Sequence, residues 1–293
     1  MPTPSPAALP IRRLTHRDLV ACADLSEDRG WPREEHKWSL LLSAGKGYGI
    51  DAPEGGLVSA CVATEYGPHD RPALGAIGMM LVAERYARQG IGRRLMRHVV
   101  SVMGPTPLTL HATPNGRPLY EELGFKATGR AEMVRGRFDP GAVRAGGLSS
   151  GIVTRAATAE DLTAILRLDE EVFGVDRTHV ITRLPAFADQ LRIAEDNGRI
   201  VGFAAAWPNM DTQVVGPLIA RDTETAKELL ASLAARTDRP LRTDIDVRHE
   251  ELLAWVKERG LAPIAFNTVM TYGIADLPGD WSRRFAPLTV AAG

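Results

Sequence analysis

The sequence predicts an α/β fold built from two tandem domains of the same kind. Two observations lead to this prediction. A buried strand, a glycine turn and an amphipathic helix follow one another between Leu74 and Met103. The order of elements in the first half of the chain then appears again, in a diverged form, in the second half. The length of 293 residues is enough for two domains of ordinary size.

The composition excludes some classes of partner. The chain carries 35 Lys and Arg against 36 Asp and Glu, so its charge indicates neither a nucleic-acid nor an acidic-membrane partner. No apolar run approaches membrane-spanning length. Residues 1–10 are rich in proline and lack a signal-peptide pattern, so we expect a disordered tail and a cytoplasmic protein. Cys22 and Cys61 are expected to be reduced core residues.

The first domain is predicted to span residues 11–140. Its early elements follow from alternating or helical patterns of apolar residues and from turn residues between them. In order, we expect a strand at Ile11–Leu14, helices at His16–Ser26 and Glu34–Ser43, and strands at Tyr48–Ile50 and Leu57–Glu65.

The glycine turn is the most informative stretch. Ala76–Val82 is predicted to be a buried strand, and the helix after the turn ends at Gly104-Pro105. Free N–H groups at a helix start bind anions, and Gly90 and Gly92 let a phosphate approach the backbone. A P-loop is excluded because no Gly-Lys-Ser/Thr follows, and a dinucleotide fingerprint is excluded because Leu95 occupies the third glycine position.

The turn resembles the pyrophosphate loop of the Gcn5-related N-acetyltransferase (GNAT) superfamily, Arg/Gln-x-x-Gly-x-Gly/Ala. The pattern falls on residues 87–92, with Ala87 in place of the usual Arg or Gln. A strand at Leu108–Ala112 and the phrase Leu-Tyr-Glu-x-Leu-Gly-Phe at Leu119–Phe125 come next. That phrase resembles the helix-to-strand turn late in the same domain, at the expected separation from the glycine turn.

The resemblance implies a mixed sheet splayed between two central strands, with acetyl-coenzyme A as co-substrate and no metal. In the family, the backbone of the splayed strand binds the pantetheine arm and the loop binds the pyrophosphate. Tyr120 would protonate the departing thiolate, as a phenol within hydrogen-bonding reach can do. The implied cofactor-binding residues are Met80, Leu81, Val82, Arg88, Gln89, Gly90, Ile91, Gly92, Arg93 and Asn115.

Residues 141–151 are rich in small residues and are predicted to be a linker. The second domain, 152–293, repeats the order of elements, including a hairpin whose Asn197-Gly198 turn favours type I′. Its stretch at Arg221–Glu228 has no glycines and carries carboxylates where a pyrophosphate would lie. Because carboxylates repel phosphate, we expect this diverged copy not to bind coenzyme A in the usual way.

Other residues have several interpretations. Asp244 and Asp246 alternate on one strand face and are candidates for binding a cationic acceptor; a metal site there is less favoured because no His or Cys cluster joins them. Glu65 is named as a candidate general base, because in this superfamily a base can come from that neighbourhood. His111 precedes Tyr120 and is interpreted as a core histidine rather than a catalytic one.

The function expected from the resemblance is an N-acetyltransferase whose first domain is catalytic. A small-molecule amine is the expected acceptor, and the second domain is expected to complete the acceptor pocket. Two alternatives stay open: a coenzyme A-binding sensor or scaffold without turnover, and a tandem acetyltransferase of the mycothiol-synthase kind. The sequence leaves open whether the protein is a monomer or a homodimer.

Overall fold

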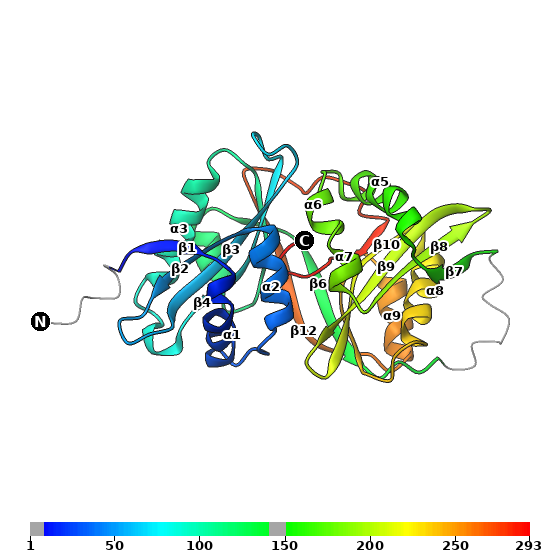
Figure 1. The fold of residues 1–293 in the computed structure, drawn as a ribbon, viewed down its shortest axis with the longest axis horizontal. Coiled ribbons are helices and arrows are strands. Elements are labelled where there is room, and N and C mark those ends of the chain that lie inside the picture. The colour runs from blue at the N-terminus through cyan, green and yellow to red at the C-terminus, as the bar shows by residue number, and fades with distance from the viewer. Residues whose placement is uncertain (1–8, 141–150) are drawn as a thin grey trace, which may run out of the picture.

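A computed structural model describes residues 9–140 and 151–293. The expected tail at 1–10 and linker at 141–151 lie almost entirely outside these residues. Figure 1 shows two halves side by side, with strands β6 and β12 crossing between them. The first half contains β1 (Ile11–Leu14), α1 (Leu19–Asp28), α2 (Glu35–Ala44), β2 (Lys46–Asp51), β3 (Leu57–Tyr66), β4 (Leu74–Val82), α3 (Ile91–Met103), β5 (Leu108–Ala112), α4 (Arg117–Glu122) and β6 (Lys126–Gly136).

The second half repeats this order with additions. It contains β7 (Val153–Ala156), α5 (Leu162–Phe173), α6 (Thr178–Ile181), α7 (Leu184–Phe187), β8 (Gln190–Asp196), β9 (Arg199–Asn209), β10 (Thr212–Ala220), α8 (Thr223–Ala234), β11 (Leu241–Asp246), α9 (Glu250–Glu258), β12 (Ala262–Tyr272) and β13 (Arg284–Ala286). The predicted hairpin is confirmed: Asn197 and Gly198 both have positive φ, as a type I′ turn requires.

The two halves share one mixed sheet. Over the described residues its strand order is β1-β2-β3-β4-β5-β12-β6-β11-β10-β9-β8-β7, with β13 added beside β10. The last strand of each half therefore pairs with the other half: β12 lies between β5 and β6, and β6 lies between β12 and β11. Neither of the two domains predicted from the sequence forms a complete sheet from its own strands.

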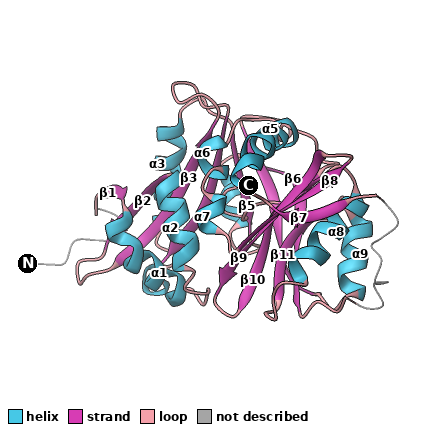
Figure 2. Ribbon diagram, turned by 45° about the vertical axis from the view of Figure 1, so that its right-hand side comes forward, coloured by secondary structure: helices cyan, strands magenta, loops and turns pink. Residues whose placement is uncertain are grey.

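The helices cover both faces of the sheet (Figure 2). Helices α1 and α2 pack against β3 and β4 on one face, and α3 packs against β3, β4 and β5 on the other. In the second half, α5–α7 and α8–α9 form the corresponding layers. Cys22 and Cys61 are buried free cysteines, as predicted. Within 9–140 and 151–293, no helix has the combined length and apolar character needed to cross a membrane.

The segment after β13, residues 287–293, returns to the first half and lies between the two halves (Figure 1). Ala291 and Ala292 join the apolar cluster of α1, α2 and β4. Tyr66 donates a hydrogen bond to the carbonyl oxygen of Ala292, and Arg177 donates one to that of Gly293 at 2.8 Å. This segment thus ties the second half to the face of the first that carries α1 and α2.

Candidate functional site between the two halves

The glycine turn forms an open helix start. Gly90 precedes α3 with φ of +76°, and Arg88 has φ of +60°. The N–H of Arg94 donates to the carbonyl oxygen of Gly90 at 3.0 Å, so the N–H groups of residues 91–93 precede the first intrahelical hydrogen bond. A side chain at Gly90 would meet nothing within 4 Å. The positive end of α3 is therefore accessible to an anion.

After Ile77, the edge of strand β4 that faces β5 is no longer paired with β5. It pairs with β5 only at Gly75, Ala76 and Ile77. A bulge then shifts its register with β3 between Gly78 and Leu81, and Met79 has φ of +51°. The two central strands diverge here, as the resemblance implies, and the divergence leads from the bulge toward the glycine turn.

The predicted cofactor side chains lie around this opening. Arg93 pairs with Glu122 of α4 at 2.6 Å, and Gln89 donates to the carbonyl oxygen of Arg85 at 3.4 Å. Asn115 is exposed in the turn before α4. The sequence motif indicates residues only as far as Arg93, but Arg94 lies beside them, and its buried Nη1 has no hydrogen-bond partner in the described part of the chain. Arg94 belongs to the same first turn of α3.

Tyr120 lies in α4 at the edge of the opening. Its side chain is 9% exposed and packs edge-on against Phe125, with 6.1 Å between ring centroids. Burial, helped by the nearby Cys61, raises the pKa of Tyr120 above its ordinary value. A phenol is protonated at neutral pH with or without this shift, and that is the state that a proton donor needs.

The corresponding places in the second half are occupied. Strand β13 pairs with β10 at Leu218 and Ile219, where β10 diverges from β11, so the chain itself fills the splay. Asp222 caps α8 and accepts a hydrogen bond from the N–H of Thr225 at 2.8 Å. Burial opposes its charge, but the hydrogen bonds from Thr225 and Arg221 lower the pKa of Asp222. A carboxylate thus caps the start of α8, whereas the start of α3 in the first half has no side-chain cap.

A cavity of about 370 Å³ lies between the halves. It begins at Thr113 and Pro114, in the turn that leads to Tyr120, and reaches Arg242 of β11. Gly116 lies between this end of the cavity and Tyr120. Its N–H donates to Thr113 Oγ1 at 3.2 Å, and a Cβ at Gly116 would lie 3.2 Å from the Tyr120 ring. Trp31, Met133 and Ala265 supply apolar lining.

A buried polar cluster that the sequence pattern did not predict forms one wall of this cavity. Glu34 is 6% exposed, has φ of +35° and pairs with Lys37. It also accepts hydrogen bonds from Asn209 at 2.9 Å and Arg242 at 3.4 Å. Burial opposes its charge, but Lys37 and Arg242 outweigh burial and lower the pKa of Glu34. The cluster joins α2 of the first half to the second half.

The remaining predicted residues lie elsewhere. Asp244 and Asp246 are buried on β11, and neither belongs to the cavity lining, although Arg242 on the same strand face does. Burial raises the pKa of Asp244. Glu65 pairs with Lys46 at 2.5 Å and lies opposite Gly75, about 13 Å along β4 from the bulge. Glu65 is therefore distant from the bulge of β4.

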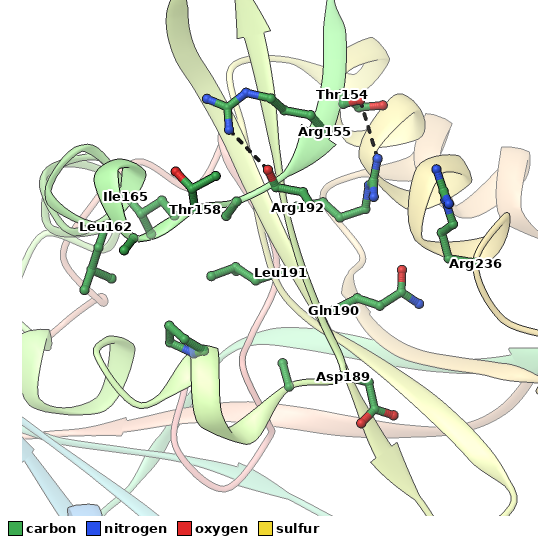
Figure 3. A pocket seen from close by; sticks show the side chains of 15 residues that line it. Thr154, Arg155, Thr158, Leu162, Ile165, Asp189, Gln190, Leu191, Arg192 and Arg236 are labelled. Carbon is green, nitrogen blue, oxygen red and sulfur yellow. Dashed lines mark hydrogen bonds between the residues drawn. The ribbon is translucent and has the colours of Figure 1, made fainter.

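A larger cavity of about 920 Å³ belongs to the second half, and its described lining comes only from residues 154–236. Figure 3 shows Arg192 and Arg236 on one side of it and Leu162 and Ile165 on the other. The glycine turn and Tyr120 lie in the other half of the molecule. In the described part of the chain, no three His, Cys, Asp or Glu side chains gather as a metal site would require.

Comparisons with known proteins agree with this arrangement. Two profiles described as acetyltransferase (GNAT) domains match residues 66–137 and 165–286. The uncharacterized N-acetyltransferase YitH of Bacillus subtilis (strain 168) is 28% identical over 228 residues, covering 76% of this chain and 77% of that protein.

Solved structures share the fold over nearly the whole chain. A Pyrococcus horikoshii protein, provisionally classed as an acetyltransferase, superposes with a TM-score of 0.80 at 19% identity, over 100% of this chain and 99% of that one. A tandem GNAT protein from the clavulanic acid biosynthesis pathway superposes with a TM-score of 0.65 at 14% identity, over 92% and 99%. Two acetyltransferase domains in one chain, joined through a common sheet, make this protein a tandem member of the GNAT superfamily.

Proposed function

We propose that the first half transfers an acetyl group from acetyl-coenzyme A to an amine held in the cavity between the halves. The observation that carries this proposal is the contrast between the two copies. The first has an open β4 edge, an uncapped α3 start and a protonated Tyr120 beside them. In the second, β13 and Asp222 occupy the equivalent positions.

Each part of the proposed site has a defined task. The N–H groups at the start of α3 would bind the pyrophosphate, with Arg88, Arg93 and Arg94 nearby as cations. The backbone of Met80–Val82 would hydrogen-bond the pantetheine arm along the open edge of β4. The thioester would then lie near the bulge, and the acceptor would approach through the cavity that begins at Thr113.

The reaction is a direct transfer. The neutral amine attacks the thioester carbonyl carbon, the C–N bond forms and the C–S bond breaks. Tyr120 gives its hydroxyl proton to the departing thiolate, and the proton lost by the amine restores the phenol through solvent. The products are an amide and free coenzyme A.

The test is thiol release from acetyl-coenzyme A by the full-length protein, with a panel of amines. Calorimetry on the same preparation is expected to give one acetyl-coenzyme A per chain. Two equivalent sites would contradict the asymmetry on which the proposal rests.

A second candidate is a sensor that binds coenzyme A without turnover. One observation favours it: residues 287–293 lie on the β4 bulge, where a Cβ at Gly78 would be 2.4 Å from the carbonyl oxygen of Ala291. Tight binding of acetyl-coenzyme A, with no thiol release for any amine beyond the rate without protein, would favour this candidate.

A further inference from the structure

Two arginines lie directly opposite each other at the end of the inter-half cavity that is remote from Tyr120. Arg242 of β11 and Arg135 of β6 are paired residues in an antiparallel ladder, so their side chains leave the same face of the sheet. Both line the cavity. Like charges directly opposite on one face repel each other, so the pair requires negative charge nearby.

Each arginine of the pair has a carboxylate partner that is either shared or exposed. Glu34 is shared between Lys37 and Arg242, and Arg135 pairs with Asp211 at 2.7 Å, where Asp211 is 73% exposed. Lys37, Arg135 and Arg242 thus share Glu34 and Asp211 in the described lining, and burial lowers the pKa of Lys37. Asp244 comes next on the same face of β11, but its burial favours the neutral carboxyl group.

Two buried polar atoms of the same wall lack partners. Nε of Arg242 and Oδ1 of Asn209 have no hydrogen-bond partner among residues 9–140 and 151–293. The side chain of Arg242 is 12% exposed and Asn209 is 5% exposed. Buried donors and acceptors are normally satisfied, so Nε of Arg242 is free to donate to an acceptor group of a ligand, whereas Oδ1 of Asn209 would take a donor.

The distance across the sheet indicates how such a ligand lies. The strand order β5-β12-β6-β11 separates the Thr113 end of the cavity from the strand of Arg242 by three strand spacings, about 14 Å. Met133 and Ala265, which are paired on the same face as the two arginines, line the cavity from the two strands between. A ligand whose reactive nitrogen lies near Tyr120 therefore passes an apolar wall before it reaches the guanidinium groups.

We propose that the acceptor is an amine that also carries a carboxylate, separated from the reactive nitrogen by an apolar spacer, and that Arg242 and Arg135 bind this carboxylate. The inference rests on the proposed function, because it names the substrate class of the same site. A carboxylate accepts two parallel hydrogen bonds from a guanidinium, and Nε is one of the donors of that fork. This reverses the expectation that Asp244 and Asp246 select a cationic acceptor.

The test compares acids with their neutral isosteres. β-Alanine, 6-aminohexanoate and L-lysine are each paired with the corresponding carboxamide. Binding to the full-length protein with coenzyme A present is measured by calorimetry, and turnover by thiol release. At least one acid is expected to bind about tenfold or more tightly than its carboxamide, the contribution of a charge-assisted hydrogen bond. No acid binding more tightly than its carboxamide would overturn the proposal.

Variants assign the preference to the two arginines. Arg242→Gln is expected to remove the preference for the acid, measured as the ratio of the acid and carboxamide dissociation constants. Arg135→Gln, at a side chain that is 41% exposed, provides the same test if Arg242→Gln does not fold. Arg192→Gln is the matched control, because Arg192 is a partly buried arginine that lines the larger cavity of the second half. An acid preference that survives in the folded Arg242→Gln and Arg135→Gln variants would also overturn the proposal.

The binding measurement distinguishes the inference about the acceptor from the proposed acetyl transfer. Acid-selective binding that depends on Arg242, without any acetyl transfer, would support this inference and contradict the proposed chemistry. Equal transfer to acids and carboxamides would support the chemistry and overturn the inference.

Discussion

His111 of β5 donates a hydrogen bond through Nδ1 to the carbonyl oxygen of Val290, at 3.0 Å. Because a carbonyl oxygen only accepts, Nδ1 carries the proton, and in the neutral ring Nε2 is the acceptor. The contact joins the central strand of the first half to the last segment of the second. Val290 also lines the inter-half cavity, so this segment contributes to the wall of the proposed acceptor site.

The His111 contact predicts a pH dependence of stability. Burial, together with Arg284, lowers the pKa of His111 to about 4, although the hydrogen bond to Val290 opposes the shift. The unfolded chain, with a histidine pKa of about 6.5, then binds more protons than the folded chain between these two values. Stability is expected to fall by up to about 3 kcal/mol as the pH decreases from 6.5 to 4.

Two measurements check this prediction. The ring protons of His111, followed by NMR, should titrate near pH 4. His111→Gln should reduce the pH dependence of the unfolding free energy over the same interval. A His111 titration near 6.5 would contradict the burial argument.

The proton-donor role of Tyr120 predicts a selective loss of turnover. Tyr120→Phe is expected to lower kcat by about 10²-fold, the lower end for general acid–base catalysis, with little change in coenzyme A affinity. Tyr272→Phe is the matched control, because Tyr272 packs on the same Phe125, with 5.2 Å between ring centroids. Equal turnover in the two variants, under conditions where chemistry limits the rate, would exclude the role.

The residues that the sequence predicted most directly are those whose chemistry lies in contiguous stretches. The Gly90 turn and Tyr120 are recognisable because a few neighbouring residues specify a backbone conformation or a helix end. The order of strands and helices could also be predicted from the sequence, because apolar periodicity is a local property. The contrast between the Gly90 turn and Asp222 could also be predicted, because each lies at the start of a helix.

The exchange of β6 and β12 could not be predicted from local pattern. Either strand alternates adequately for the sheet of its own half, and the choice of partner depends on contacts distant in sequence. Glu34 was missed for a related reason. It lies in the charged run Arg33-Glu34-Glu35, which favours an exposed helix start, and only Asn209 and Arg242 of the other half bury it. Residues 284–293 form a short apolar stretch without periodicity. No sequence pattern therefore predicted strand β13 or its place beside β10.

The glycine turn predicts different effects for two matched glycines. Gly90 and Gly198 both have φ of +76°, and a Cβ at either would meet nothing within 4 Å. Gly90→Ala and Gly198→Ala are therefore each expected to lose about 1 kcal/mol of stability from the left-handed backbone. Only Gly90→Ala should weaken coenzyme A binding, by about tenfold, since its methyl group lies at the start of α3. Equal dissociation constants in calorimetry would contradict the proposed pyrophosphate site.

The ion pair between Asp169 and Arg177 predicts a large stability effect. Both side chains are 2% exposed, and the pair is bidentate, with both N–O distances at 2.8 Å. Arg177 also holds Gly293 at 2.8 Å and lies over the Phe173 ring, 4.0 Å from its centroid. Asp169→Ala leaves this guanidinium buried without its carboxylate, so the unfolding free energy should fall by about 3–5 kcal/mol in urea denaturation. Asp169→Asn keeps one acceptor oxygen and should lose less.

An exposed pair is the control for that measurement. Arg117 and Glu121 are 2.7 Å apart, and their side chains are 46% and 47% exposed, so Glu121→Ala should change stability by less than about 1 kcal/mol. Because Arg177 anchors the segment that carries Val290, Asp169→Ala should also raise the KM of the acceptor more than that of acetyl-coenzyme A. Equal destabilisation by Asp169→Ala and Glu121→Ala would show that the buried pair does not hold the final segment in place.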